Sequence, residues 1–182
     1  MSQLDPLFRP AVRPALDQFA RRALKAYGIS DEATLRLVNL SENATYRVDC
    51  NGKSHALRIH REGYHSRAAI ASELAWLMAL RAAQVAITPK PVKGLDGEII
   101  QHAIADGMET GRHFVLFDWE AGEEPLITAD LSQHFATLGE VTARMHQHAR
   151  QWPRPTGFTR LKWDFESALG EANPHWGRWR DG

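Results

Sequence analysis

Two residues of opposite charge stand in apolar surroundings, where they could bind the phosphates of a ligand. Arg58 lies in the run Ala56-Leu57-Arg58-Ile59, which is typical of a buried strand, and an unpaired charge there would be costly. Glu73 follows on the apolar side of a predicted helix. We expect the two side chains to form a desolvated ion pair. Taken alone, such a pair either anchors phosphate groups or merely ties the helix to the strand.

Two other segments offer main-chain and small polar groups. The loop Leu40–Val48 contains Ser41 and Asn43, and backbone N–H groups in a tight turn can contact phosphate oxygens. This loop has no glycine, and a Ser-Glu-Asn turn taken alone is nearly always just a turn. The run Phe114–Gly122 predicts a buried strand that passes into a linker. Taken alone, it is an ordinary strand end.

Other catalytic chemistries find little support. The chain has nine histidines, but His146 and His148 are two apart on a predicted helix and point in different directions. His55, His60 and His65 have no partner cluster in the sequence, and no His-Glu-x-x-His motif occurs. Neither a nucleophile elbow nor a Gly-x-Gly-x-x-Gly motif is present. We predict no metal site in this chain.

The composition narrows the class of protein. The 182 residues include 22 basic and 22 acidic ones, so the formal charge is 22 − 22 = 0, which argues against nucleic-acid binding. The 43% of apolar residues is a normal globular share, and no apolar run approaches the ~20 residues of a membrane span. A single cysteine fits a reducing compartment. We expect a soluble, cytoplasmic protein without nucleic-acid or membrane partners.

The first half of the chain predicts a helix followed by a three-stranded meander. Apolar spacing indicates a helix over Pro14–Tyr27, which ends at Gly28. The period then changes to two, and Asn51-Gly52 is the preferred type I′ turn of a hairpin. The predicted strands are Thr34–Leu40, Ala44–Cys50 and Ser54–His60.

The second half alternates helices and strands. Ser66 caps a predicted helix over Arg67–Ala83. Two strands follow, Glu98–Ala103 and Arg112–Trp119, and a loop over Ile104–Gly111 joins them. A long helix covers Leu131–Arg150, with an apolar inner face made by Phe135, Leu138, Val141, Thr142 and Met145. Strands with segregated helices indicate an α+β fold.

This order of elements is that of the small lobe of a protein-kinase-like fold. We expect a five-stranded antiparallel sheet with a helix, then a hinge and the first helix of an incomplete helical large lobe. The expected boundaries are an N-terminal helical segment at 1–30, the small lobe at 31–120 and the hinge with the start of the large lobe at 121–182. In that fold a basic residue on the third strand pairs with a glutamate on the next helix and orients the ATP phosphates. This context favours a phosphate anchor over a purely structural pair.

From Leu37 to about Trp163 the sequence resembles the N-terminal part of the aminoglycoside phosphotransferase / choline kinase / homoserine kinase type II superfamily. The similar stretches are Asn43–Val48, Ala56–Arg61, Ser72–Leu74, Phe114–Gly122 and Leu138–His146. The last of these resembles the helix that opens the family's large lobe. The resemblance implies transfer of phosphate from ATP, with Mg²⁺, to a hydroxyl or less often an amine of a small molecule.

The resemblance also implies roles for individual residues. It places seven in the ATP site: Ser41, Asn43, Arg58, Glu73, Phe117, Asp118 and Glu120. Arg58 takes the phosphate-anchoring position, where many relatives have lysine. The Asp118 carbonyl and the Glu120 amide would contact the adenine edge, with Phe117 behind the base.

One part of the family's pattern is missing. Catalysis in the family rests on a later His-Gly-Asp-x-x-x-x-Asn loop and a metal-binding aspartate, and no His-Gly-Asp occurs in this sequence. Chain order places that loop, and the Mg²⁺ ligands, beyond residue 182, so we expect no catalytic residue within this chain. The sequence fits the N-terminal part of a small-molecule kinase whose acceptor is not readable here. The alternative is a complete pseudokinase-like module for nucleotide sensing or protein interaction.

Overall fold

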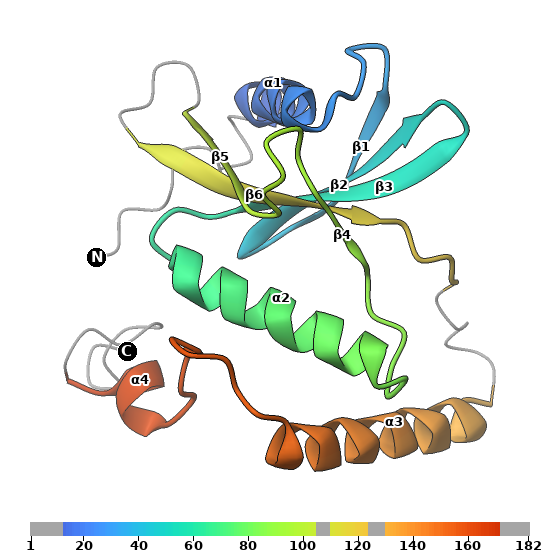
Figure 1. Ribbon diagram of the computed structural model, residues 1–182, viewed down its shortest axis with the longest axis vertical. Coiled ribbons are helices and arrows are strands. Elements are labelled where there is room, and N and C mark those ends of the chain that lie inside the picture. Colours follow the sequence, from blue (N-terminus) through green and yellow to red (C-terminus); the bar gives the residue numbers. More distant parts are fainter. Residues whose placement is uncertain (1–12, 105–109, 124–129, 172–182) are drawn as a thin grey trace.

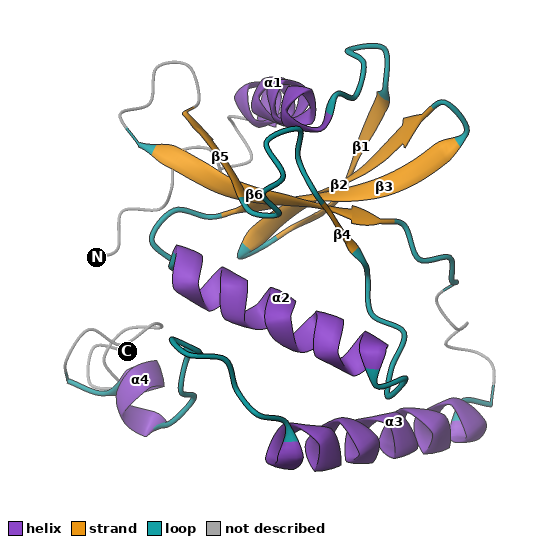
Figure 2. Ribbon diagram, viewed as in Figure 1, coloured by secondary structure: helices purple, strands orange, loops and turns teal. Residues whose placement is uncertain are grey.

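The computed structural model describes residues 13–104, 110–123 and 130–171, and all structural statements below concern these residues. An antiparallel sheet lies between two helices, with α1 on one face and α2 on the other (Figure 1). The long helix α3 follows beyond α2, on the side away from the sheet (Figure 2). The predicted α+β class and the antiparallel sheet are confirmed.

The N-terminal helix forms as its apolar spacing predicts. Helix α1 (Arg13–Ala23) continues into a 3₁₀ helix, η3 (Leu24–Tyr27), which ends at Gly28, with φ 66°. Glycine adopts that left-handed conformation without the steric cost that a Cβ brings. The helix therefore stops where the sequence predicts.

A three-stranded meander follows, close to the predicted bounds. It consists of β1 (Thr34–Leu40), β2 (Asn43–Cys50) and β3 (Lys53–His60). Asn51 and Gly52 have φ 50° and 73°, the positive values that a type I′ turn requires. This turn fixes the pairing of β2 with β3, in which Thr45 lies opposite Arg58.

The predicted number of five strands is wrong, because the sheet has one more. The sheet is six-stranded in the order β1-β2-β3-β6-β4, and β5 pairs with another part of β6. The additional strand, β4 (Pro91–Val92), has two residues, too short for an alternating pattern to reveal. Strand β5 (Gln101–Ile104) begins later than predicted, while β6 (Gly111–Asp118) agrees closely with prediction. Most of the loop predicted between β5 and β6 lies outside the described residues.

Apolar side chains form a core on each face of the sheet. The larger cluster joins α1 to one face, with Phe19 of α1 in edge contact with Phe114 of β6. The smaller cluster joins α2 to the other face and contains Ile70, Leu74, Val115 and Phe117. Since side chains alternate along a strand, residues of β3 and β6 contribute to both cores.

The helices differ in how much they bury. Ser66 caps α2 (Arg67–Ala82), because its hydroxyl accepts a hydrogen bond from the Ala69 amide at 3.1 Å. By contrast, α3 (Ser132–Gln151) has no buried residue, and α4 (Phe165–Leu169) was not predicted. The predicted inner face of α3 is therefore wrong for the described residues: Phe135 is 65% exposed and Leu138 is 58% exposed.

None of the described helices is long and apolar enough to cross a membrane. The expected lobe boundaries at residues 30 and 120 stay a prediction. The expected N-terminal segment includes residues 1–12, which lie outside the described residues.

Candidate nucleotide-binding site

The predicted ion pair between β3 and α2 is formed. Nη1 of Arg58 lies 2.6 Å from Oε1 of Glu73. The two side chains are 24% and 21% exposed, so the pair is mostly withdrawn from water but still accessible to a ligand. Such a charge-assisted hydrogen bond fixes the direction of the guanidinium.

The sheet supports the guanidinium of Arg58 from beneath. Arg58 lies between Thr45 of β2 and Val115 of β6 in the strand register, so it stands near the middle of the α2-facing side. Its guanidinium lies over the Phe117 ring, 4.9 Å from the ring centroid. This cation–π contact holds the arginine flat against the sheet.

A second arginine shares the same carboxylate. Nη1 of Arg160 lies 3.7 Å from Oε2 of Glu73. The neighbouring residue Thr159 donates its amide hydrogen to the Ser72 hydroxyl at 2.9 Å. These two contacts attach the segment after α3 to α2. Sequence reasoning did not find them, because an exposed arginine in a loop has no local signal that names its partner.

The three charges favour an anion at this position. Two guanidinium groups and one carboxylate leave one net positive charge. Burial by itself would raise the pKa of Glu73, but the charge and hydrogen bond of Arg58, with the charge of Arg160, lower it further than burial raises it. Glu73 is thus held ionised, and a bound phosphate would find an uncompensated cation beside it.

The loop between β1 and β2 is tight and carries the two predicted polar residues. The Ser41 amide donates to the Asn43 carbonyl at 3.0 Å, and the Ser41 hydroxyl accepts from Asn39 at 3.2 Å. Asn43 lies opposite His60 in the register and therefore on the same face of the sheet as Arg58. Its side-chain oxygen is buried and has no hydrogen-bond partner among the described residues.

At the end of β6, where the sequence predicts a hinge, the first two main-chain amides are occupied. The Asp118 amide donates to the Lys90 carbonyl at 2.8 Å, and the Trp119 amide donates to the Ser54 carbonyl at 3.3 Å. The amide of Glu120 makes no main-chain hydrogen bond within the described part of the chain. It is therefore the first amide along this segment that a ligand can use.

Side chains at the hinge bind to the protein itself. The Glu120 carboxylate lies 2.7 Å from Nη1 of Arg81, in the last turn of α2, and the same nitrogen donates to the Thr88 carbonyl. The Asp118 carboxylate lies 3.7 Å from Nδ1 of His55. If Asp118 and Glu120 contact a ligand, main-chain atoms are the ones available. The link through Arg81 is a second contact that the sequence did not indicate.

The structure brings some of the seven predicted residues together and spaces the others along the sheet. Arg58, Glu73 and Phe117 are in contact. Asn43 and Asp118 lie opposite His60 and His55 of β3, so five residues of strand, roughly 17 Å, separate the two ends of the site. Arg58 stands between these ends. Within the described part of the chain, no group of three or more side chains is arranged to hold a metal ion.

Comparisons with known proteins relate this chain to phosphotransferases. The profile of the phosphotransferase enzyme family matches residues 34–181. A solved microcompartment-associated aminopropanol kinase has 42% sequence identity and a TM-score of 0.79, over 91% of this chain and 50% of that one. A search of curated proteins gives no match.

Two more distant solved structures share the fold. An amicoumacin kinase in complex with AMP-PNP, Ca²⁺ and Ami has 22% identity and a TM-score of 0.70, over 84% of this chain and 46% of that one. A spectinomycin phosphotransferase in complex with ADP and spectinomycin has 18% identity and a TM-score of 0.51. The match covers 71% of this chain and 37% of that one. The chain thus spans about half, or less, of the length of the solved relatives that it matches.

Proposed function

This chain belongs to the phosphotransferase enzyme family, and on that premise we propose that it forms the ATP-binding part of a small-molecule kinase. The observation that carries the proposal is the pair of Arg58 and Glu73, held at 2.6 Å on the α2-facing side of the sheet. Element order, ion pair and hinge agree with one nucleotide orientation. The adenine lies at the end of β6 and the phosphates lie toward the β1–β2 loop.

Arg58 is the proposed anchor for the phosphates. Glu73 fixes one side of its guanidinium, and the Phe117 ring supports its plane. The remaining N–H groups are donors that a phosphate can accept. Ser41 and Asn43 would add contacts from the loop, where Asn43 has a buried oxygen to satisfy.

The hinge is the proposed adenine contact. The Asp118 carbonyl would accept from the exocyclic amine of the base, and the Glu120 amide would donate to a ring nitrogen. The amides of Asp118 and Trp119 already bind Lys90 and Ser54, which leaves these two groups for the ligand. Phe117 would close the site behind the base, since it is buried at this end of the smaller core.

For the acceptor we propose the hydroxyl of a short amino alcohol. The support is the aminopropanol kinase, the relative at 42% identity. The two antibiotic kinases share the fold alone and do not choose between acceptors. An amine acceptor is a less common alternative within this class of enzyme.

Mg²⁺ belongs to the proposal only as a partner of the nucleotide. The described residues provide no cluster of ligating side chains for it, and the sequence has no His-Gly-Asp motif. Phosphoryl transfer depends on positioning of the acceptor and neutralisation of charge at the transferred group. Residues 1–182 alone are therefore expected to bind adenine nucleotides weakly and not to transfer phosphate.

The test separates the phosphate contacts from the adenine contacts. ADP and adenosine are titrated by calorimetry into the 182-residue chain and into Arg58→Ala, with Arg36→Ala as an exposed arginine control on the same sheet. Arg58→Ala should weaken ADP binding about tenfold or more and leave adenosine binding unchanged. Arg36→Ala should match the parent.

Two results would contradict the proposal. One is that ADP and adenosine bind with equal affinity, since the phosphates then have no anchor. The other is that residues 1–182 turn over ATP with aminopropanol above background and that Arg58→Ala abolishes this turnover. That result would mean that the catalytic residues have been misplaced.

A further inference from the structure

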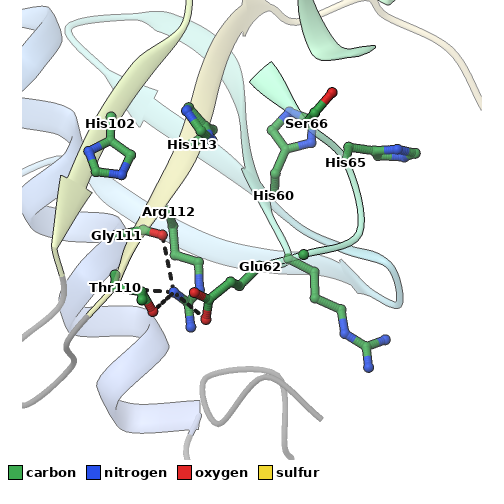
Figure 3. A pocket seen from close by; sticks show the side chains of 11 residues that line it. His60, Glu62, His65, Ser66, His102, Thr110, Gly111, Arg112 and His113 are labelled. Atoms are coloured by element: carbon green, nitrogen blue, oxygen red, sulfur yellow. Dashed lines mark hydrogen bonds and ion pairs between the residues drawn. The ribbon is translucent and has the colours of Figure 1, made fainter. Parts of the chain in front are cut away.

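The arginines of this protein differ in how far their N–H groups are already used. Arg112, whose side chain is fully buried, lies 3.2 Å from Glu62 in the wall of a cavity of about 470 Å³ (Figure 3). It also donates to the Thr110 and Gly111 carbonyls, at 3.2 and 3.1 Å. These contacts direct the guanidinium of Arg112 to the protein itself.

Two arginines close to the hinge are held in the same way. Arg47 donates to the Asp49 carboxylate at 3.0 and 3.1 Å and lies over the Trp119 ring. Arg81 donates to the Glu120 carboxylate at 2.7 Å. Both guanidinium groups are thus committed to partners within the chain.

Arg160, the second arginine at Glu73, is held more loosely. Nη1 of Arg160 lies 3.7 Å from Oε2 of Glu73, which makes an ion pair but is too long for a hydrogen bond. Its side chain makes no hydrogen bond with any described residue, and it is 46% exposed, against 24% for Arg58. The N–H groups of Arg160 are therefore available to a ligand.

The chain beside Arg160 keeps it at this position. The segment after α3 runs toward α2 (Figure 1), and the Thr159 amide donates to the Ser72 hydroxyl at 2.9 Å. Within the segment, the Phe158 ring makes an edge contact with Trp152 at 5.5 Å between ring centroids. Since Ser72 directly precedes Glu73 on α2, these contacts hold Arg160 near the carboxylate in addition to its own charge.

Arg160 decides the net charge of the site. Arg58 and Glu73 are 2.6 Å apart and their charges sum to zero, so this pair by itself gives an anion no net attraction. Arg160 adds the one uncompensated positive charge. Within the described part of the chain, no cluster of side chains could hold a metal ion to supply that charge instead. A phosphate beside Arg58 therefore depends on Arg160 for its charge balance.

We propose that Arg160 is a second phosphate-binding residue, which holds an adenine nucleotide together with Arg58. The inference rests on the proposed nucleotide-binding function and adds to it a residue from outside the sheet. Both guanidinium groups meet one carboxylate, each at a different oxygen, so they lie close to each other. The oxygens of a phosphate chain can accept hydrogen bonds from both arginines, while Glu73 keeps the two in place.

Ligands with and without phosphates test this assignment. ADP and adenosine are titrated by calorimetry into the 182-residue chain in the presence of EDTA, so that no metal ion adds charge. Arg160→Ala should weaken ADP binding about three- to tenfold and leave adenosine binding unchanged. Arg154→Ala is the matched control, because this arginine is exposed on the same segment, and it should give the affinity of the parent.

Two further variants separate phosphate binding from attachment of the segment. Ser72→Ala removes the hydrogen bond from Thr159 but keeps all three charges, so ADP affinity should stay within about twofold of the parent. Arg160→Lys keeps the charge and should retain part of the affinity that Arg160→Ala loses. Added NaCl should weaken ADP binding less steeply in Arg160→Ala than in the parent or in Ser72→Ala, because one screened attraction is gone.

The outcomes distinguish this inference from the proposed function. If Arg58→Ala weakens ADP binding and Arg160→Ala does not, the phosphate anchor stands and the role of Arg160 is refuted. Equal losses in Ser72→Ala and Arg160→Ala would also refute that role, since Arg160 would then only attach the segment. If the parent binds ADP no more tightly than adenosine, both proposals fail.

Discussion

Arg160, on the segment that follows α3, lies 3.7 Å from the carboxylate of Glu73, on the oxygen that Arg58 does not bind. One carboxylate on α2 therefore holds a strand of the sheet on one side and the segment after α3 on the other. The adjacent hydrogen bond from Thr159 to Ser72 reinforces the second link. Any ligand that moves Arg58 will therefore also affect the ion pair between Glu73 and Arg160.

Glu73→Gln should destabilise the protein in a pH-dependent way. The pKa of Glu73 is lowered in the folded state, so its contribution is present above its ordinary value of about 4.5 and is lost as pH falls through the folded pKa. We expect a loss of about 1–3 kcal/mol at pH 7, between the values for exposed and buried pairs. Urea unfolding of both proteins from pH 7 to pH 3 should show the difference shrinking below about pH 4.5.

An exposed pair gives the matched control for that experiment. Glu98 lies 3.5 Å from Arg67, and both side chains are largely exposed. Glu98→Gln should change the free energy of unfolding by less than about 1 kcal/mol at any pH in the range. A pH-independent loss in Glu73→Gln would mean that the carboxylate contributes through packing and not through its charge.

Tyr27→Phe should cost more stability than Tyr46→Phe. The Tyr27 hydroxyl accepts a hydrogen bond from the buried Leu116 amide at 3.1 Å, whereas the Tyr46 hydroxyl donates to Asp17 at 2.6 Å. Removal of the first deletes a hydrogen bond to a buried main-chain N–H, at about 1–3 kcal/mol. Removal of the second leaves a half-exposed carboxylate that water can reach, at about 1 kcal/mol. Thermal melts of the two variants check this order, and the reverse order would contradict it.

His60→Gln should flatten the dependence of stability on acid. In the folded state burial lowers the pKa of His60 to about 3, against 6.5 in the unfolded chain. The unfolded state therefore binds a proton first, and stability falls as pH drops from about 6.5 toward 3. The cost should reach about 3 kcal/mol by pH 4. Urea titrations in phosphate-free buffer should show this slope in the parent and in His146→Gln, and a smaller slope in His60→Gln.

Polar substitutions on α3 should be harmless to this chain. Phe135 and Leu138 are exposed, so Phe135→Ser with Leu138→Ser should change the free energy of unfolding by less than about 0.5 kcal/mol. The same pair should raise solubility, because it removes exposed apolar surface. Phe114→Ala, in the core, should instead cost about 3–5 kcal/mol. A large loss on α3 would show that its apolar side is covered in solution.

Local signals predicted the elements well and their partners less well. The Asn51-Gly52 turn fixes a hairpin through the backbone conformations of two residues, so it is readable from sequence. Strand β4 pairs with β6 over two residues and leaves no periodic pattern. The apolar side of α3 has the spacing of a buried face, but spacing does not say what covers it.

In the candidate site, too, the sequence predicted local features but not the contacts between distant residues. Arg58 and Glu73 were paired correctly, because a charge in a buried strand must find a partner and the next helix offered one. Arg160 and Arg81 bind across long stretches of chain, and exposed arginines look alike in sequence. His60, His102 and His113 come side by side through the pairing of three strands, β3, β5 and β6, which only the register reveals.

The place of β6 in the sheet sets an order of events during synthesis. β6 pairs with β3, β4 and β5, yet among the strands of the described residues it is the last to be made. The ribosome adds 118 − 60 = 58 residues between the end of β3 and the end of β6, which takes roughly 3–12 s at about 5–20 residues per second. Throughout that interval the nascent meander has an open edge at β3 and no Phe114 for α1 to pack against. A pause in translation between these strands would prolong the exposure of that edge to other chains.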